Sequence, residues 1–71
     1  MAYYVDVILP IPVNQKFTYI ISKDEYDFIK PGMRIIVPFG KSKLYTSVSY
    51  ETSDQNEGDY ELKSIIQIID D

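Results

Sequence analysis

The segment PFGKSK at residues 38–43 places a glycine directly before two lysines, which is a combination that suits phosphate binding. Gly40 allows the backbone to approach a ligand closely. The ammonium groups of Lys41 and Lys43 can neutralise a phosphate. A hairpin corner with two solvated lysines would have the same composition, so this segment alone leaves both interpretations open.

Aromatic side chains are the second group of residues that could bind a ligand, since the 71 residues include seven tyrosines and three phenylalanines. Single-stranded nucleic acid is commonly held by aromatic rings that stack on bases, with cations nearby on the phosphates. A small β-barrel also fills its interior with large side chains. Both roles remain open for the five rings that flank the basic stretch of the chain, namely Phe17, Tyr19, Phe39, Tyr45 and Tyr50.

The charges are unevenly distributed along the chain. The formal net charge of −4 argues against nucleic acid, but residues 1–50 carry six basic and four acidic groups. Residues 51–71 carry seven acidic groups and a single basic one, Lys63. The distribution allows a small anion-binding face or a mixed solvated surface. The sequence has no extended basic stripe of the kind found in proteins that bind along a nucleic-acid backbone.

The composition excludes several kinds of site. Because the 71 residues contain no histidine, cysteine or tryptophan, a His/Cys metal site, a thiol nucleophile, a His-assisted triad and a disulfide framework are ruled out. A carboxyl group that acts as a general acid needs a raised pKa, which requires burial. The carboxylate pairs Asp24/Glu25 and Asp70/Asp71 lie in polar segments, so we do not expect them to be catalytic. No phosphate-loop, dinucleotide or nucleophile-elbow motif is present. We therefore expect a chain that is not an enzyme and, lacking an apolar run for a membrane span or signal peptide, is cytoplasmic.

The elements that must position these residues are strands. A chain of 71 residues has room for one domain. Ser22 and Glu25 have the spacing of a capping box, which predicts a short helical turn over residues 22–30. Pro38 is expected to push the end of its strand to an edge or a bulge. With a polar loop at 52–59, the pattern predicts an all-β, small five- to six-stranded barrel-like domain with one short helical turn. Its expected strands cover residues 3–9, 17–21, 33–39, 44–51 and 60–69.

Three segments in this order resemble one family: VILPIPVNQKFTY, then KPGMRIIVPFGKSK, then ELKSIIQIID. They are similar to the N-terminal 3′ DNA-binding domain of the bacterial primosomal replication-restart helicase (primosomal protein N′, PriA). The resemblance extends from about Val5 to Asp71. It implies that residues 1–71 form a single 3′ DNA-end-binding domain, which is a fragment of a longer helicase.

The resemblance implies a function and a set of partners. The domain would bind the 3′ end of single-stranded or forked DNA at stalled replication forks. The parent resembles an ATP-dependent 3′-to-5′ DNA helicase that binds ATP, Mg and Zn, and these 71 residues are expected to hold no cofactor. Other primosome and single-strand-binding proteins would be partners of the full-length protein. No membrane partner is expected, and the location would be nucleoid-associated.

The resemblance also carries roles onto individual residues. Phe17 would contact the terminal base, and Gly40 would leave room for the nucleotide. Many relatives have Asp where this chain has Thr18, whose hydroxyl can still accept a hydrogen bond from the terminal 3′-hydroxyl but without the charge. Lys63 and Lys41 would contact phosphate.

One alternative comes from the acidic end of the chain. The domain would then be a small β-barrel protein-interaction module that docks a basic partner through its acidic C-terminal third. Lys63 discriminates between the two hypotheses, because its replacement weakens DNA binding only if the domain binds DNA.

Overall fold

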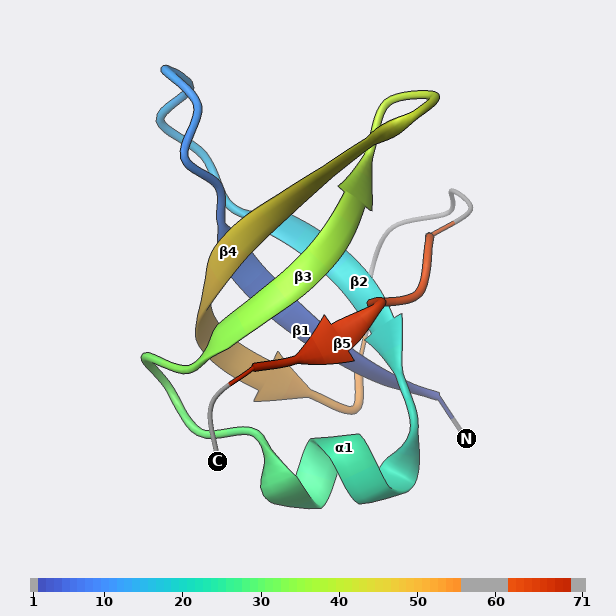
Figure 1. Ribbon diagram of the computed structural model, residues 1–71. Helices are drawn as coiled ribbons and strands as arrows, with labels where there is room; N and C mark the ends of the chain where they lie inside the picture. The colour runs from blue at the N-terminus through green and yellow to red at the C-terminus, as the bar shows by residue number, and fades with distance from the viewer. Residues whose placement is uncertain (1, 56–61, 70–71) are drawn as a thin grey trace.

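Five antiparallel-paired strands and one short helix make up the computed structural model, which describes residues 2–55 and 62–69 (Figure 1). The strands lie in the order β2-β1-β4-β3-β5. The predicted all-β class is therefore confirmed. In chain order the elements are β1 (Tyr3–Ile8), β2 (Phe17–Ile21), α1 (Lys23–Phe28), β3 (Arg34–Phe39), β4 (Lys43–Ser53) and β5 (Gln67–Ile68).

The sheet coils toward a barrel but is not closed by continuous ladders. Its two edges meet at a single parallel bridge between Ile20 of β2 and Ser64. At this bridge the Ile20 N–H donates to the Lys63 carbonyl over 2.9 Å. The described residues thus form a barrel-like sheet with a seam, which we define as this contact between β2 and the segment before β5.

The core follows from the alternation of apolar residues along the strands. Val5 and Val7 of β1 are fully buried, as are Ile35 and Val37 of β3. Removing these side chains from water is the main stabilising contribution to a sheet of this size. The rest of the buried apolar set consists of Leu9, Tyr19, Ile21, Ile29 and Ile65.

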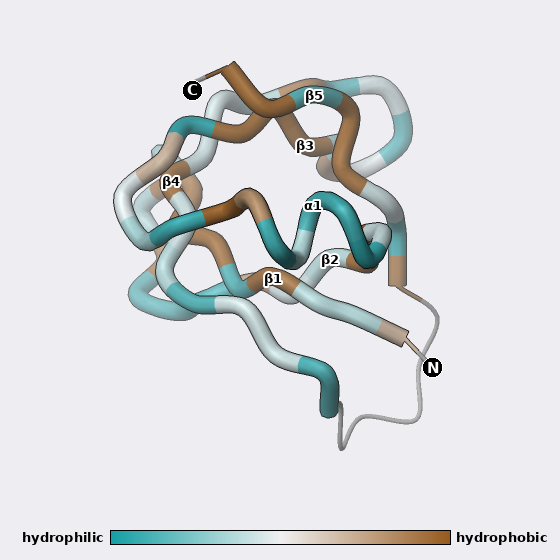
Figure 2. The backbone as a smooth tube through the Cα atoms, turned by 90° about the horizontal axis from the view of Figure 1, so that it is seen from below, coloured by the Kyte–Doolittle hydropathy of each residue, from teal (hydrophilic) through white to brown (hydrophobic). Residues whose placement is uncertain are grey.

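Helix α1 begins with the predicted capping box. The Ser22 hydroxyl accepts a hydrogen bond from the Glu25 N–H over 3.1 Å, and the Ser22 N–H donates to the Glu25 carboxylate over 2.7 Å. The helix packs through Tyr26, whose ring centre lies 4.7 Å from that of Tyr3. Figure 2 shows that α1 lies across one end of the sheet. In the described part of the chain, no helix has the length and apolar character needed to cross a membrane.

Pro38 has the expected edge position on its β5 side, because the ladder between β3 and β5 stops at Ile36, but it neither forms a bulge nor ends its strand. It lies inside β3 and pairs with Leu44 of β4 in continuous register. Ile36 presents its carbonyl to the β5 side, where it accepts from the Ile66 N–H over 2.8 Å. Because backbone groups alternate sides along a strand, Pro38 also faces the β5 side, so its missing N–H removes no bond to β4.

The predicted fifth strand over residues 60–69 is wrong in extent. Residues 60 and 61 lie outside the described residues, and the regular strand covers only Gln67–Ile68. The segment divides its backbone bonds between two neighbours, since the Lys63 carbonyl accepts from β2 and the Ile66 N–H donates to β3. A segment that serves both sheet edges cannot form a long ladder with either one. The predicted loop is shorter at its start, because β4 continues to Ser53.

Candidate functional site

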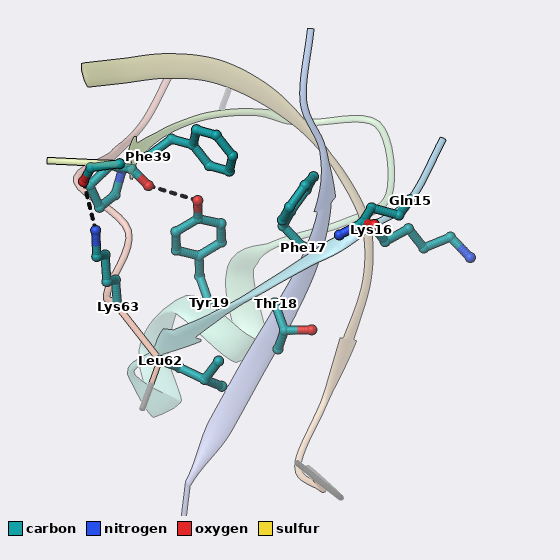
Figure 3. Close-up of a pocket in the computed structure, with 10 residues that line it drawn as sticks. Gln15, Lys16, Phe17, Thr18, Tyr19, Phe39, Leu62 and Lys63 are labelled. Carbon is teal, nitrogen blue, oxygen red and sulfur yellow. Dashed lines mark hydrogen bonds between the residues drawn. The ribbon is translucent and has the colours of Figure 1, made fainter. Parts of the chain in front are cut away.

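A pocket of about 440 Å³ lies where β2, the end of β3 and the segment before β5 come together (Figure 3). It lies beside the seam, and its walls are segments that are far apart in the sequence. Its lining residues are Gln15, Lys16, Phe17, Thr18, Tyr19, Pro38, Phe39, Gly40, Leu62 and Lys63. We call this the seam pocket.

Aromatic rings form one wall of the seam pocket. Phe17 and Phe39 pack edge to face, with ring centres 5.3 Å apart and planes at 83°. Tyr19 is buried below them, and its hydroxyl donates to the Pro38 carbonyl over 2.7 Å. Burial raises the pKa of Tyr19 above its ordinary value. Phe17 is only half-buried, so the wall offers an accessible apolar ring on a rigid base.

Gly40 and Lys63 form the opposite side of the seam pocket. Gly40 begins the turn between β3 and β4 with a φ of +70°, and no atom lies within 4 Å of the position that a Cβ would occupy. The Lys63 ammonium donates to the Gly40 carbonyl over 2.8 Å (Figure 3). An ammonium has three N–H donors. Lys63 is exposed, so its ammonium can meet an anion while it keeps the bond to Gly40.

Thr18 reaches the seam pocket by its backbone. Its side chain points to the opposite face of β2 from Phe17 and Tyr19 (Figure 3), where the hydroxyl donates to an Asp6 carboxylate oxygen over 2.5 Å. The Ile20 N–H points away from β1, toward Lys63. Backbone groups alternate sides along a strand, so the N–H and C=O of Thr18 point to the same edge as those of Ile20. This edge borders the seam pocket.

Lys41 lies outside the seam pocket and lines a neighbouring one, which shares Phe39 and Gly40 with it. Of the five predicted residues, Phe17, Gly40 and Lys63 are thus brought together around the seam pocket. Thr18 lines it through its backbone, while the hydroxyl predicted to meet the 3′-hydroxyl bonds to Asp6 on the other face. Lys41 is next to the pocket.

Lys16 lines the seam pocket but was not predicted from the sequence. Its side chain points away from the rings of the pocket (Figure 3), and its ammonium lies 3.8 Å from the ring centre of Tyr50. The one feature of the sequence that could have indicated this role is its position immediately before Phe17. That position alone does not distinguish Lys16 from the other lysines as a pocket residue.

The charge of the seam pocket differs from that of the whole chain. Among the described residues that line it there are two lysines and no carboxylate, although the chain carries a net charge of −4. The C-terminal third, whose carboxylates are the basis of the protein-interaction hypothesis, contributes Leu62 and Lys63 to this lining. Five of its carboxylates lie outside the described residues: Glu57, Asp59, Glu61, Asp70 and Asp71. The pocket suits a ligand that combines a flat ring with a negative charge.

Comparison with known families identifies a family to which the chain is similar. The family model of the 3′ DNA-binding domain (3′BD) of PriA matches residues 6–71, which include every residue that lines the seam pocket. A comparison with curated proteins finds no match. Since the family match covers nearly all of the chain, this chain belongs to the PriA 3′ DNA-binding domain family, whose members bind the 3′ end of DNA.

Proposed function

We propose that the chain recognises the 3′ end of a DNA strand at stalled replication forks, as the end-binding part of a longer replication-restart helicase. One observation supports this most strongly. Phe17, Gly40 and Lys63 come from three separate segments and line one pocket. These are the residues to which the family resemblance assigns the terminal base, the space beside it and the phosphate.

The proposed mechanism uses the walls of the seam pocket. The terminal base packs on Phe17 without base-specific contacts, because every base has an apolar face. Lys63 neutralises the phosphate of that nucleotide through its ammonium. The backbone C=O of Thr18 faces the same edge and is the acceptor that we assign to the 3′-hydroxyl. The seam, where the Ile20 N–H donates to the Lys63 carbonyl, borders the pocket beyond Thr18. We propose that it leaves no path for a strand that continues past the terminal nucleotide.

End recognition is tested with two single-stranded oligonucleotides that carry a 5′ fluorophore and differ only in a 3′-hydroxyl or a 3′-phosphate. We expect the 3′-phosphate to weaken binding about tenfold, because it removes the hydroxyl donor and adds bulk at the closed end of the pocket. Fluorescence anisotropy titrations give both affinities. Equal affinities for the two oligonucleotides would contradict end recognition.

Lys63→Gln tests the phosphate contact. The amide of glutamine can still donate to the Gly40 carbonyl, so this change removes the charge and keeps a donor. We expect affinity for the 3′-hydroxyl oligonucleotide to fall about tenfold. Lys30→Gln is the matched control, because it changes the net charge equally and Lys30 does not line the seam pocket. Equal effects of the two variants would indicate general electrostatics instead of a contact.

A further inference from the structure

A second pocket lies against the hairpin that joins β3 to β4. It has a volume of about 360 Å³ and is lined by Phe39, Gly40, Lys41, Ser42, Lys43 and Tyr45. We call it the hairpin pocket. The β3–β4 hairpin lies at the opposite end of the sheet from α1 (Figure 1), and the end-binding mechanism proposed above does not use the hairpin pocket.

The hairpin pocket adjoins the seam pocket. The two share Phe39 and Gly40 as lining residues. Their rings also form one row, since Phe39 packs edge to face on Phe17 at 5.3 Å and on Tyr45 at 5.7 Å between ring centres. A ligand that leaves the seam pocket past Gly40 therefore meets another aromatic ring, that of Tyr45, which is half-buried.

The charges favour an anionic ligand in the hairpin pocket. Lys41 and Lys43 are both exposed, and the lining of this pocket within residues 2–55 and 62–69 includes no carboxylate. The turn between them is short, so both ammonium groups extend from the same corner of the hairpin. Two cations beside an aromatic ring are the combination that holds one nucleotide of a single strand.

A pocket on another side of the seam pocket, with which it shares Gln15 and Lys16, lacks this combination. It has a volume of about 310 Å³ and is lined by Ile8, Val13, Asn14, Gln15 and Lys16, without an aromatic ring. Its one lysine places the ammonium over the ring of Tyr50. Both the rings and the charges therefore favour the hairpin side as the path of the strand.

We propose that the hairpin pocket is a second nucleotide subsite, which binds the nucleotide that precedes the terminal one in single-stranded DNA. Its base packs on Tyr45, and its phosphate lies between Lys41 and Lys43. The inference rests on the proposed function, since the terminal nucleotide has to occupy the seam pocket first. It adds the direction in which the strand leaves that pocket.

The test compares two ligands with a free 3′-hydroxyl, thymidine 5′-monophosphate and the 5′-phosphorylated dinucleotide of thymidine. For the unmodified chain we expect the dinucleotide to bind about tenfold more tightly, because one additional base stacks and one additional phosphate is neutralised. Titrations followed by NMR or calorimetry give both affinities. We call the ratio of dinucleotide affinity to mononucleotide affinity the gain. In Lys43→Gln and in Tyr45→Leu this gain should fall below about twofold, with mononucleotide affinity unchanged.

Lys16→Gln is the matched control, because it removes one charge on the other side of the seam pocket. In this variant the gain from mononucleotide to dinucleotide should remain about tenfold. Lys43 is exposed, so its replacement tests the proposal even if Tyr45→Leu does not fold. A gain that survives in Lys43→Gln, or that is lost in Lys16→Gln, would overturn the second subsite.

The outcomes separate this inference from the proposed function. If the mononucleotide binds and Phe17→Leu weakens it, but the dinucleotide binds no better, then only the second subsite is wrong. If the mononucleotide and the 3′-hydroxyl oligonucleotide both fail to bind, then the proposed function is wrong and the subsite with it.

Discussion

Lys63 takes part in two hydrogen bonds that hold different walls of the seam pocket. Its backbone carbonyl accepts from Ile20 and its ammonium donates to the Gly40 carbonyl. The side chain is therefore already fixed near the position in which we propose that it meets a phosphate. A fixed side chain loses less conformational entropy on binding than a free one, which makes this lysine more effective than its neighbours on the surface.

Tyr19 supports the same pocket from below, and its hydroxyl can be removed alone. We expect Tyr19→Phe to lower the free energy of unfolding by about 1 kcal/mol at neutral pH, because the Pro38 carbonyl loses its donor. Urea denaturation of the variant and the unmodified chain measures the difference. A variant of unchanged stability would show that solvent replaces this donor without cost.

The contribution of Tyr19 should also depend on pH. Burial raises the pKa of Tyr19 above 10.0 in the folded chain, so on titration the unfolded chain releases this proton first. The stabilisation is complete below the unfolded pKa and is lost as pH rises through the folded pKa. The difference in stability between the unmodified chain and Tyr19→Phe should therefore shrink above pH 10. A difference that stays constant under alkaline conditions would contradict this assignment.

At the scale of elements, the hairpin between β3 and β4 depends on the backbone of Gly40. Its φ is +70°, and nothing within 4 Å would meet an added Cβ. Residues other than glycine lose roughly 1–2 kcal/mol in this conformation. We expect Gly40→Ala to lower the free energy of unfolding by about this amount, and Gly40→Asn to lower it less, because asparagine adopts positive φ more readily. Thermal denaturation measures both, and equal losses would argue against a conformational cause.

Elements with local signals were predictable from the sequence. The capping box of α1 needs only Ser22 and Glu25, three residues apart, and its predicted bonds are present. The alternation of β2 also places Thr18 on the opposite face from Phe17, so the direction of its hydroxyl was within reach of the sequence. Its bond to Asp6 was not, because that bond depends on the register between β1 and β2.

Elements that depend on distant partners were not predictable. The segment before β5 has the apolar composition of a long strand, but it is shared between β2 and β3, and no local pattern records this. The same holds for the seam pocket. The contact between Lys63 and Gly40 joins two non-strand segments that are 23 residues apart in the sequence, so the resemblance to a family was the indication that these residues lie together.

At the scale of the whole molecule, charge sets how binding responds to salt. The net charge of −4 gives no long-range attraction to DNA, so binding depends on local contacts. For single strands the slope of log affinity against log salt is about −0.7 per phosphate neutralised. Two phosphates, at Lys63 and at the hairpin lysines, predict a loss of about sevenfold between roughly 50 and 200 mM salt. Anisotropy titrations across this range measure the slope, and a slope of about −4 or steeper would indicate an extended DNA path.

The seam also affects the order of events during folding. The walls of the pocket come from β2, from the hairpin after β3 and from residues 62 and 63, close to the end of the chain. The pocket is therefore completed only when this last segment joins the two sheet edges. A ligand that contacts both walls binds only the joined form and shifts the equilibrium toward it. Under the proposed function, occupancy by DNA and completion of the fold are a single linked equilibrium.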